Sequence, residues 1–109
     1  MNLVVAVIED VEKVPDIMSQ LNAHGICGAT VLDSYGMGRI LSRSHKEISD
    51  KAIISYYLSE RRPTNRTIFV VVDDDKLDET IAIFQDIVGD FKEPKTGIMF
   101  TLKLESAFK

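Results

Sequence analysis

Apolar residues divide the first third of the chain into a predicted strand, helix and strand. Residues 3–8 form a continuous apolar run that is typical of a buried central strand. Apolar residues then recur at helical spacing, which predicts a helix over about 15–24 with Pro15 at its start and Gly25 after its end. Residues 29–35 form the second predicted strand.

The last third of the chain repeats this order. Residues 67–72 are β-branched and aromatic, which indicates a third core strand. A second helix follows and stops at Gly89, and residues 98–104 alternate between apolar and polar as in a half-exposed final strand. The pattern predicts an α+β fold of the ferredoxin-like βαββαβ type. It has an antiparallel four-stranded sheet and a long insertion between strands 2 and 3, in one domain over 1–109.

The middle segment, residues 42–66, is too long for a hairpin loop. Ser49 can cap a helix, which Pro63 then ends. The apolar residues of this helix are Ile53, Ile54, Tyr57 and Leu58. Two interpretations stay open: a mobile segment that a ligand orders, or a fixed helix that packs on a neighbouring subunit.

Charge is unevenly distributed along the chain. Residues 39–66 carry seven basic and three acidic residues, a local +4 in a chain whose net charge is −4. A basic stretch on an acidic body favours a local anion site and argues against general nucleic-acid binding. No apolar run is long enough to span a bilayer, so we expect no membrane insertion. The single cysteine, Cys27, excludes an internal disulfide and fits a cytoplasmic location.

A G-x-G-R sequence follows the second predicted strand. Gly36 and Gly38 would let ligand atoms approach the backbone, and successive amides of such a turn can form an anion-binding nest. Arg39 offers a fork of charged donors suited to phosphate. Taken alone, the same residues also fit an ordinary strand-end turn with a solvated arginine.

The stretch "GICGATVLDSYGMGR", from Gly25 to Arg39, resembles the nitrogen-regulatory P-II signalling family. That family has a helix ending in G-[VI]-x-G, then a T-V strand, then G-x-G-R. P-II proteins are trimers that bind adenine nucleotides in clefts between subunits, and they signal by moving a long loop onto partner proteins. The resemblance implies that residues 40–66 take the place of this mobile T-loop.

The resemblance also implies a set of nucleotide-binding residues. These are Thr30 near the nucleobase, Gly36, Met37, Gly38 and Arg39 near the ribose and phosphates, and Gly97 near the phosphates. Two family positions differ: Ile40 replaces a glutamine, and Ile98 replaces the lysine that follows the glycine. Lys95 is therefore a candidate phosphate contact in place of that lysine.

The resemblance implies a regulatory protein and not an enzyme. We expect a homotrimer that binds ATP, ADP, AMP or a cyclic nucleotide and regulates an unidentified enzyme or transporter, with nitrogen or carbon metabolism as one setting. The alternatives are a structural or ion-tolerance trimer without nucleotide binding, and a slow nucleotide hydrolase. No catalytic motif is found, and the carboxylates of residues 73–75 fit a helix start better than a metal site.

Overall fold

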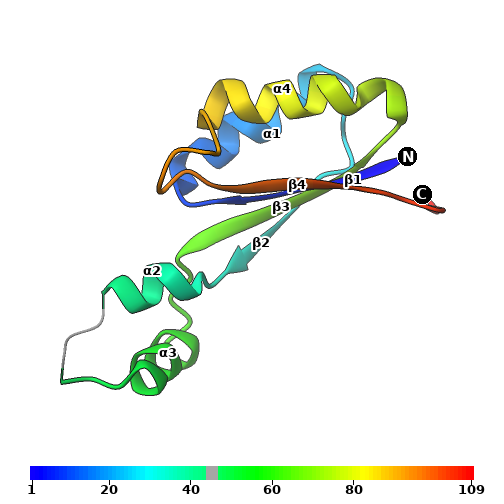
Figure 1. The fold of residues 1–109 in the computed structure, drawn as a ribbon. Coiled ribbons are helices and arrows are strands. Elements are labelled where there is room, and N and C mark those ends of the chain that lie inside the picture. The colour runs from blue at the N-terminus through cyan, green and yellow to red at the C-terminus, as the bar shows by residue number, and fades with distance from the viewer. Residues whose placement is uncertain (44–46) are drawn as a thin grey trace.

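The computed structural model describes residues 1–43 and 47–109, and shows one antiparallel sheet with two helices on one face (Figure 1). The strands are β1 (Asn2–Ile8), β2 (Thr30–Ser34), β3 (Asn65–Val72) and β4 (Gly97–Lys103), in the order β2-β3-β1-β4. Helices α1 (Val14–Ala23) and α4 (Leu77–Val88) cover one face of the sheet, and each is preceded by a short 3-10 turn. The predicted ferredoxin-like arrangement is confirmed.

The insertion between β2 and β3 forms an arm that projects from this body. Helix α2 (Met37–Ser42) leads away from β2, and α3 (Asp50–Ser59) packs mainly against α2 and returns the chain to β3. The arm makes the molecule elongated, at 51 × 28 × 21 Å (Figure 1). Residues 44–46, which belong to the segment expected to replace the T-loop, lie outside the described residues.

The core lies between the sheet and the two covering helices. Strands β1 and β3 are central, and α1 and α4 cover their alternate side chains, which are buried. Most of the remaining side chains of both strands are also apolar and lie on the opposite face of the sheet, so the two strands are nearly continuous apolar runs. The largest core side chain is that of Phe84 on α4, and it is fully buried. Its neighbours in the core include Val4, Ala6, Ile8, Ile17, Leu21, Ile68 and Val70.

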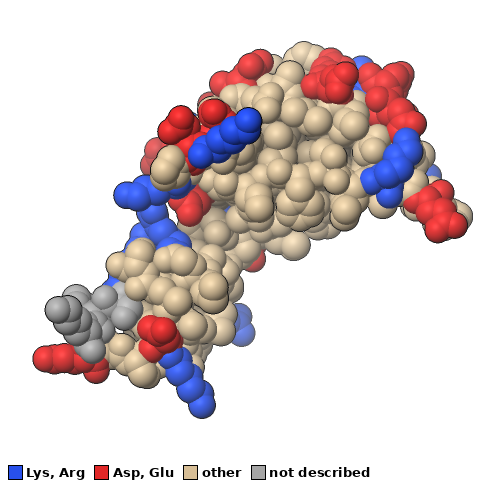
Figure 2. Space-filling view, in the orientation of Figure 1, with Lys and Arg blue, Asp and Glu red and all other residues tan. Residues whose placement is uncertain are grey.

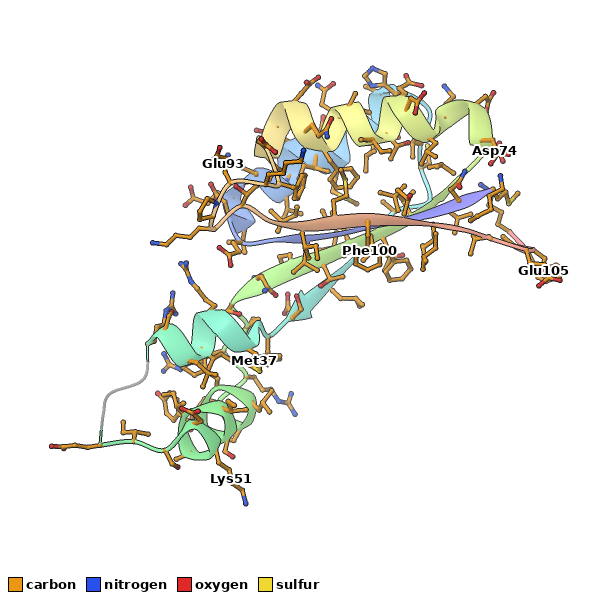
Figure 3. The ribbon with its side chains drawn as sticks, viewed as in Figure 1. Met37, Lys51, Asp74, Glu93, Phe100 and Glu105 are labelled. Carbon is orange, nitrogen blue, oxygen red and sulfur yellow. The ribbon has the colours of Figure 1, made fainter. Side chains whose placement is uncertain are left out.

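The other face of the sheet is apolar and has no helix over it. Phe100 on β4 points away from α1 and α4 (Figure 3), and its side chain is 43% exposed. The register places the same-facing apolar residues in cross-strand rows, because Val5 pairs with both Phe69 and Phe100, and Leu3 with both Val71 and Leu102. We call this surface, with Leu32 and Ile98, the open face. An apolar surface of this kind marks an interaction site.

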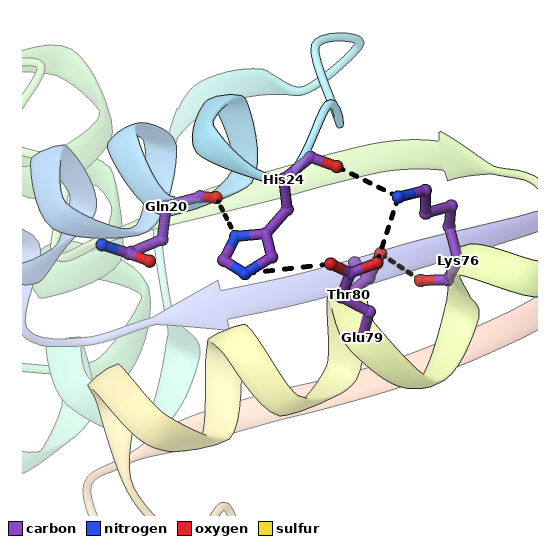
Figure 4. A network of polar contacts seen from close by, with 5 residues as sticks. All are labelled: Gln20, His24, Lys76, Glu79 and Thr80. Carbon is purple, nitrogen blue, oxygen red and sulfur yellow. Dashed lines mark hydrogen bonds and ion pairs between the residues drawn. The ribbon is translucent and has the colours of Figure 1, made fainter.

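A polar network joins the end of α1 to the start of α4 (Figure 4). The Nδ1–H of His24 donates to the carbonyl oxygen of Gln20 at 2.8 Å, which leaves Nε2 facing the Glu79 carboxylate at 3.8 Å. Lys76 Nζ donates to the His24 carbonyl oxygen and to Glu79, both at 3.2 Å. A lysine on the last carbonyls of a helix satisfies acceptors that the helix itself cannot pair, so the network fixes how α1 meets α4.

Asp74 links the start of β1 to the end of β4. Lys103 at the end of β4 donates to its carboxylate at 2.6 Å, and Asn2 at the start of β1 donates at 2.7 Å. The hydrogen bond from Lys103 is the main reason why the pKa of Asp74 falls from 3.8 to about 2, and the amino terminus adds to it. The carboxylate therefore keeps these partners until the pH approaches that value.

The arm helices differ in how well the sequence predicted them. Helix α3 was expected: the Ser49 hydroxyl accepts the Ala52 N–H at 3.2 Å, and the helix ends before Pro63 in a Schellman motif with Arg61 at φ +52°. Helix α2 was not expected, because its two glycines suggested a turn. In the described residues, no helix is long and apolar enough to cross a membrane.

Candidate functional site

The end of β1 lies between the starts of β3 and β4, at the edge of the sheet where the arm joins the body. Ile8 at the end of β1 pairs with Arg66 on β3 and with Gly97 on β4. The segments that continue from these strands therefore meet at one edge of the sheet. Figure 2 shows basic side chains gathered near this junction, with acidic ones beside them.

A pocket of 340 Å³ lies at this edge. Arg39 of α2 and Lys95, which precedes β4, both line it. Its other walls are Glu9, Asp10, Val11 and Glu12, the residues that follow β1. The structure thus brings together two cations that were predicted to contact phosphate, although they lie far apart in the sequence. It places three carboxylates beside them that the sequence analysis did not single out.

Gly97 is needed at the start of β4 for a steric reason. Its φ is +127°, and a Cβ at this position would lie 1.9 Å from the carbonyl oxygen of Val7. Only glycine lets β4 approach β1 this closely in that conformation. Lys95, two residues earlier, has φ +67°, so the chain turns sharply just before the strand. This turn sets the position from which the Lys95 side chain reaches the pocket.

Gly36 and Gly38 do not form the expected anion-binding nest. Gly36 has an extended conformation at the start of α2 and Gly38 is helical, so neither has a positive φ. The N–H of Gly36 already donates to Thr64 Oγ1 at 2.8 Å. A Cβ at Gly36 would lie 2.7 Å from the Asn65 side chain, so this glycine allows α2 to pack against the start of β3. A Cβ at Gly38 would meet nothing within 4 Å.

Polar side chains that the sequence analysis missed hold the base of the arm. Asn65 is buried, with 5% of its surface exposed, and accepts a hydrogen bond from the Ser34 hydroxyl. Thr67 donates to the same hydroxyl at 2.9 Å, and Arg66 pairs with Asp33 at 3.0 Å. These contacts fix the point at which the chain leaves β2 and returns through β3, and so they fix where α2 carries Arg39.

Arg39 and Glu9 face each other across the pocket. Arg39 Nη1 lies 3.9 Å from Glu9 Oε2, and the two side chains are 36% and 25% exposed. This distance is longer than a charged hydrogen bond, so the two groups attract each other electrostatically but are not hydrogen-bonded. Ile40, the next residue on α2, is only 2% exposed.

The family model described as nitrogen regulatory protein P-II matches residues 1–109, the whole chain. This chain belongs to the P-II family. A search of curated proteins found no match. Membership supports a regulatory signalling protein and explains the ferredoxin-like sheet, and proteins of this family are typically trimers that interact with partners.

In this P-II protein, the pocket unites only part of the predicted residue set. Thr30 pairs with Phe69 at the far end of β2, three pairs from Asp33, which is about 10 Å along the strand. Met37 is 70% exposed and is not among the residues that line the pocket. Thr30 and Met37 stay predictions, and both lie on surface that a second subunit could approach.

A second pocket, of 390 Å³, lies between α1 and α4. Asp16, His24, Glu79 and Asp86 are among its walls, and it contains none of the residues expected from the P-II resemblance. Within residues 1–43 and 47–109, no group of three or more histidine, cysteine or carboxylate side chains is arranged to hold a metal ion. The pocket at the base of the arm is therefore the better candidate site.

Proposed function

We propose that this P-II protein binds an adenine nucleotide in the pocket at the base of the arm and regulates a partner protein in response. The observation that supports this most strongly is that Arg39 and Lys95, from separate segments, line one pocket next to Gly97. Two cations on a pocket wall suit the phosphates of a nucleotide, and arginine can bind them with two parallel hydrogen bonds.

The proposed assembly is a homotrimer, with the nucleotide in the cleft between subunits. The open face supports assembly, because Leu32, Ile98, Phe100 and Leu102 are between 43% and 57% exposed in the single chain. A domain of this size gains stability by covering such a surface with further copies. A second subunit at this edge of the sheet would complete the walls of the pocket.

The ligand is AMP, ADP, ATP or a cyclic nucleotide, and the partner is an enzyme or transporter of the cytoplasm. A thermal-shift screen with these nucleotides and with 2-oxoglutarate tests the proposal. At a ligand concentration a hundred times its dissociation constant, binding stabilises the folded state by about 2.7 kcal/mol, which raises the unfolding temperature measurably. No shift with any of these compounds would refute nucleotide binding.

Arg39→Ala is expected to weaken nucleotide binding by about 1.5–3 kcal/mol, the range for hydrogen bonds to charged groups. The reason is that, among the described residues, Arg39 and Lys95 are the two cations in the walls of the pocket. Isothermal titration calorimetry measures the change. Arg62→Ala is the matched control, because Arg62 lies on the arm over the Tyr56 ring and does not line the pocket. Equal affinities for both variants would show that Arg39 is a surface residue.

We propose that the arm, within residues 40–66, is the part that contacts the partner. Helix α3 has no fully buried residue, and Tyr56 and Leu58 on it are 45% and 50% exposed. A helix with so few buried contacts opens easily, so a ligand at its base can change its population of ordered states.

Hydrogen exchange is expected to show this difference. Amides of α3 should exchange faster than those of α4, whose Phe84 and Thr80 are fully buried, and they should slow when the best nucleotide is added. The α4 amides serve as the internal control. If α3 is as protected as α4 and does not respond to nucleotide, the arm is a fixed structural element.

One observation favours the alternative of a structural trimer that binds no nucleotide. Glu9, Asp10 and Glu12 place three carboxylates in the same pocket as two cations. Negative side chains oppose the binding of phosphate. This alternative predicts a trimer in solution with no response in the ligand screen.

A further inference from the structure

Glu9 occupies a fixed position at the floor of the pocket. It follows Ile8 directly, and Ile8 is held on one side by Arg66 of β3 and on the other by Gly97 of β4. Because the central strand is paired on both sides, the backbone of Glu9 has little freedom to move. Its carboxylate therefore has a defined place between the base of α2 and the turn before β4.

One carboxylate oxygen of Glu9 is buried without a hydrogen-bond partner among the described residues, although the side chain as a whole is 25% exposed. Its Oε2 atom is buried and accepts no hydrogen bond from any residue that the structure describes. The cation that faces it is Arg39, with Nη1 at 3.9 Å, whereas charged hydrogen bonds are about 2.7–2.9 Å long. A carboxylate oxygen that is buried without a hydrogen-bond partner is unfavourable, so its position calls for an explanation.

Glu9 differs from the other two carboxylates of the pocket. Asp10 accepts the N–H of Glu12 at 3.2 Å, which caps the 3-10 turn that precedes α1, and both Asp10 and Glu12 are exposed. Glu9 alone among the three forms an ion pair with Arg39. Glu12 is thus a carboxylate of the same kind in the same pocket that does not contact the arginine.

We propose that Glu9 is the internal counter-ion of Arg39, which a nucleotide phosphate must displace in order to bind. The inference rests on the proposed function, because it assigns the residue that limits the affinity of that site. In the empty pocket, Arg39 pairs with Glu9. When a nucleotide phosphate binds the Arg39 guanidinium, the Glu9 carboxylate loses its ion-pair partner. It then lies close to the negatively charged phosphate.

The competition makes Glu9 a specificity-determining residue. Repulsion between a carboxylate and a ligand grows with the negative charge of the ligand. Glu9 therefore disfavours a triphosphate more than a diphosphate, and a diphosphate more than a monophosphate. A chain with Glu9 next to Arg39 should discriminate in favour of the less charged adenine nucleotides.

Calorimetric titration of ATP, ADP and AMP into three proteins tests the inference: the wild type, Glu9→Gln and Glu12→Gln, at one fixed salt concentration. Glu9→Gln should bind ATP about tenfold more tightly and AMP only about two- to threefold more tightly, as expected for the loss of one close charge. Glu12→Gln removes a charge of the same sign from the same pocket without breaking an ion pair with Arg39, so it should raise the affinity for each nucleotide less than Glu9→Gln does. Thermal unfolding confirms that the variants fold.

The outcomes separate this inference from the proposed function. If the wild type binds nucleotide and Glu9→Gln behaves as Glu12→Gln does, or binds more weakly, the counter-ion role is refuted while nucleotide binding stands. If only Glu9→Gln binds, Glu9 blocks the pocket, and the proposed function fails for the native chain. If none of the three proteins binds, both proposals fail. Glu9→Asp, which keeps the charge but withdraws it from Arg39, gives an intermediate preference and replaces Glu9→Gln if that variant does not fold.

Discussion

Gly97→Ala is expected to destabilise the protein by roughly 3 kcal/mol or more, because the new methyl group cannot be accommodated without moving a strand. Its Cβ would lie 1.9 Å from the carbonyl oxygen of Val7, and the φ of +127° is unfavourable for any residue except glycine. The atom in the way belongs to the backbone of the central strand, so it cannot rotate aside. Strand β4 must separate from β1 at this end, and Lys95 moves with it.

Urea unfolding measures the loss of stability, and titration with the best nucleotide measures the effect on the pocket. Gly38→Ala is the matched control. It makes the same chemical change at a helical glycine whose added Cβ meets nothing within 4 Å, so it should stabilise the protein by about 0.5–1 kcal/mol. If the Gly97→Ala variant were as stable as the wild type, the start of β4 would have to differ from the structure described.

Phe100→Glu is expected to convert the proposed trimer into single chains. Phe100 lies in a cross-strand row at the centre of the open face, beside Val5. In an assembly that covers this face, the substitution buries a carboxylate with no partner, which costs about 3–5 kcal/mol. Light scattering should then report a mass near 12.2 kDa, that of one chain.

Phe108→Glu is the control for this experiment, because it introduces the same charge at a phenylalanine that is 96% exposed. It should leave the mass of the assembly unchanged. Two results would contradict the prediction: a wild-type protein that is already monomeric at tens of micromolar, or a Phe100→Glu variant that assembles as the wild type does. Circular dichroism confirms that each variant keeps its fold.

Most of the sheet could be predicted from the sequence because its pattern of burial is simple. The apolar run at residues 3–8 appears as β1, and the alternation at 98–104 appears as β4, with one face on the core and the other on the open face. Helix α3 was also predicted, since its cap and its Pro63 boundary are local signals. Local chemistry and the final fold agree at these positions.

Helix α2 could not be predicted because its cause is tertiary. A glycine at its N-cap and another in its first turn favour a turn by local propensity. The helix forms because Ile40 becomes buried and because Thr64, far along the chain, accepts the N–H of Gly36. Neither contact has a signal in the local sequence.

The candidate site was predicted only in part for a related reason. Family resemblance pointed to Arg39, and Lys95 was predicted as a substitute for the lysine that the family has after the glycine. The opposing residue, Glu9, depends on which strand ends lie next to each other. That follows from the pairing of Ile8 with Arg66 and Gly97, and spacing along the chain does not show it.

The arm leaves and re-enters the sheet at two residues that face each other, Ser34 and Asn65. The two ends of the insertion are therefore held together by the sheet, so the insertion is a closed loop. The entropic cost of closing such a loop rises only slowly with its length. Mutations, insertions and deletions beyond this base can accumulate with little effect on folding of the body. The surface proposed to meet a partner can thus evolve independently of the candidate pocket, so a change confined to the arm would alter the proposed target and leave the pocket intact.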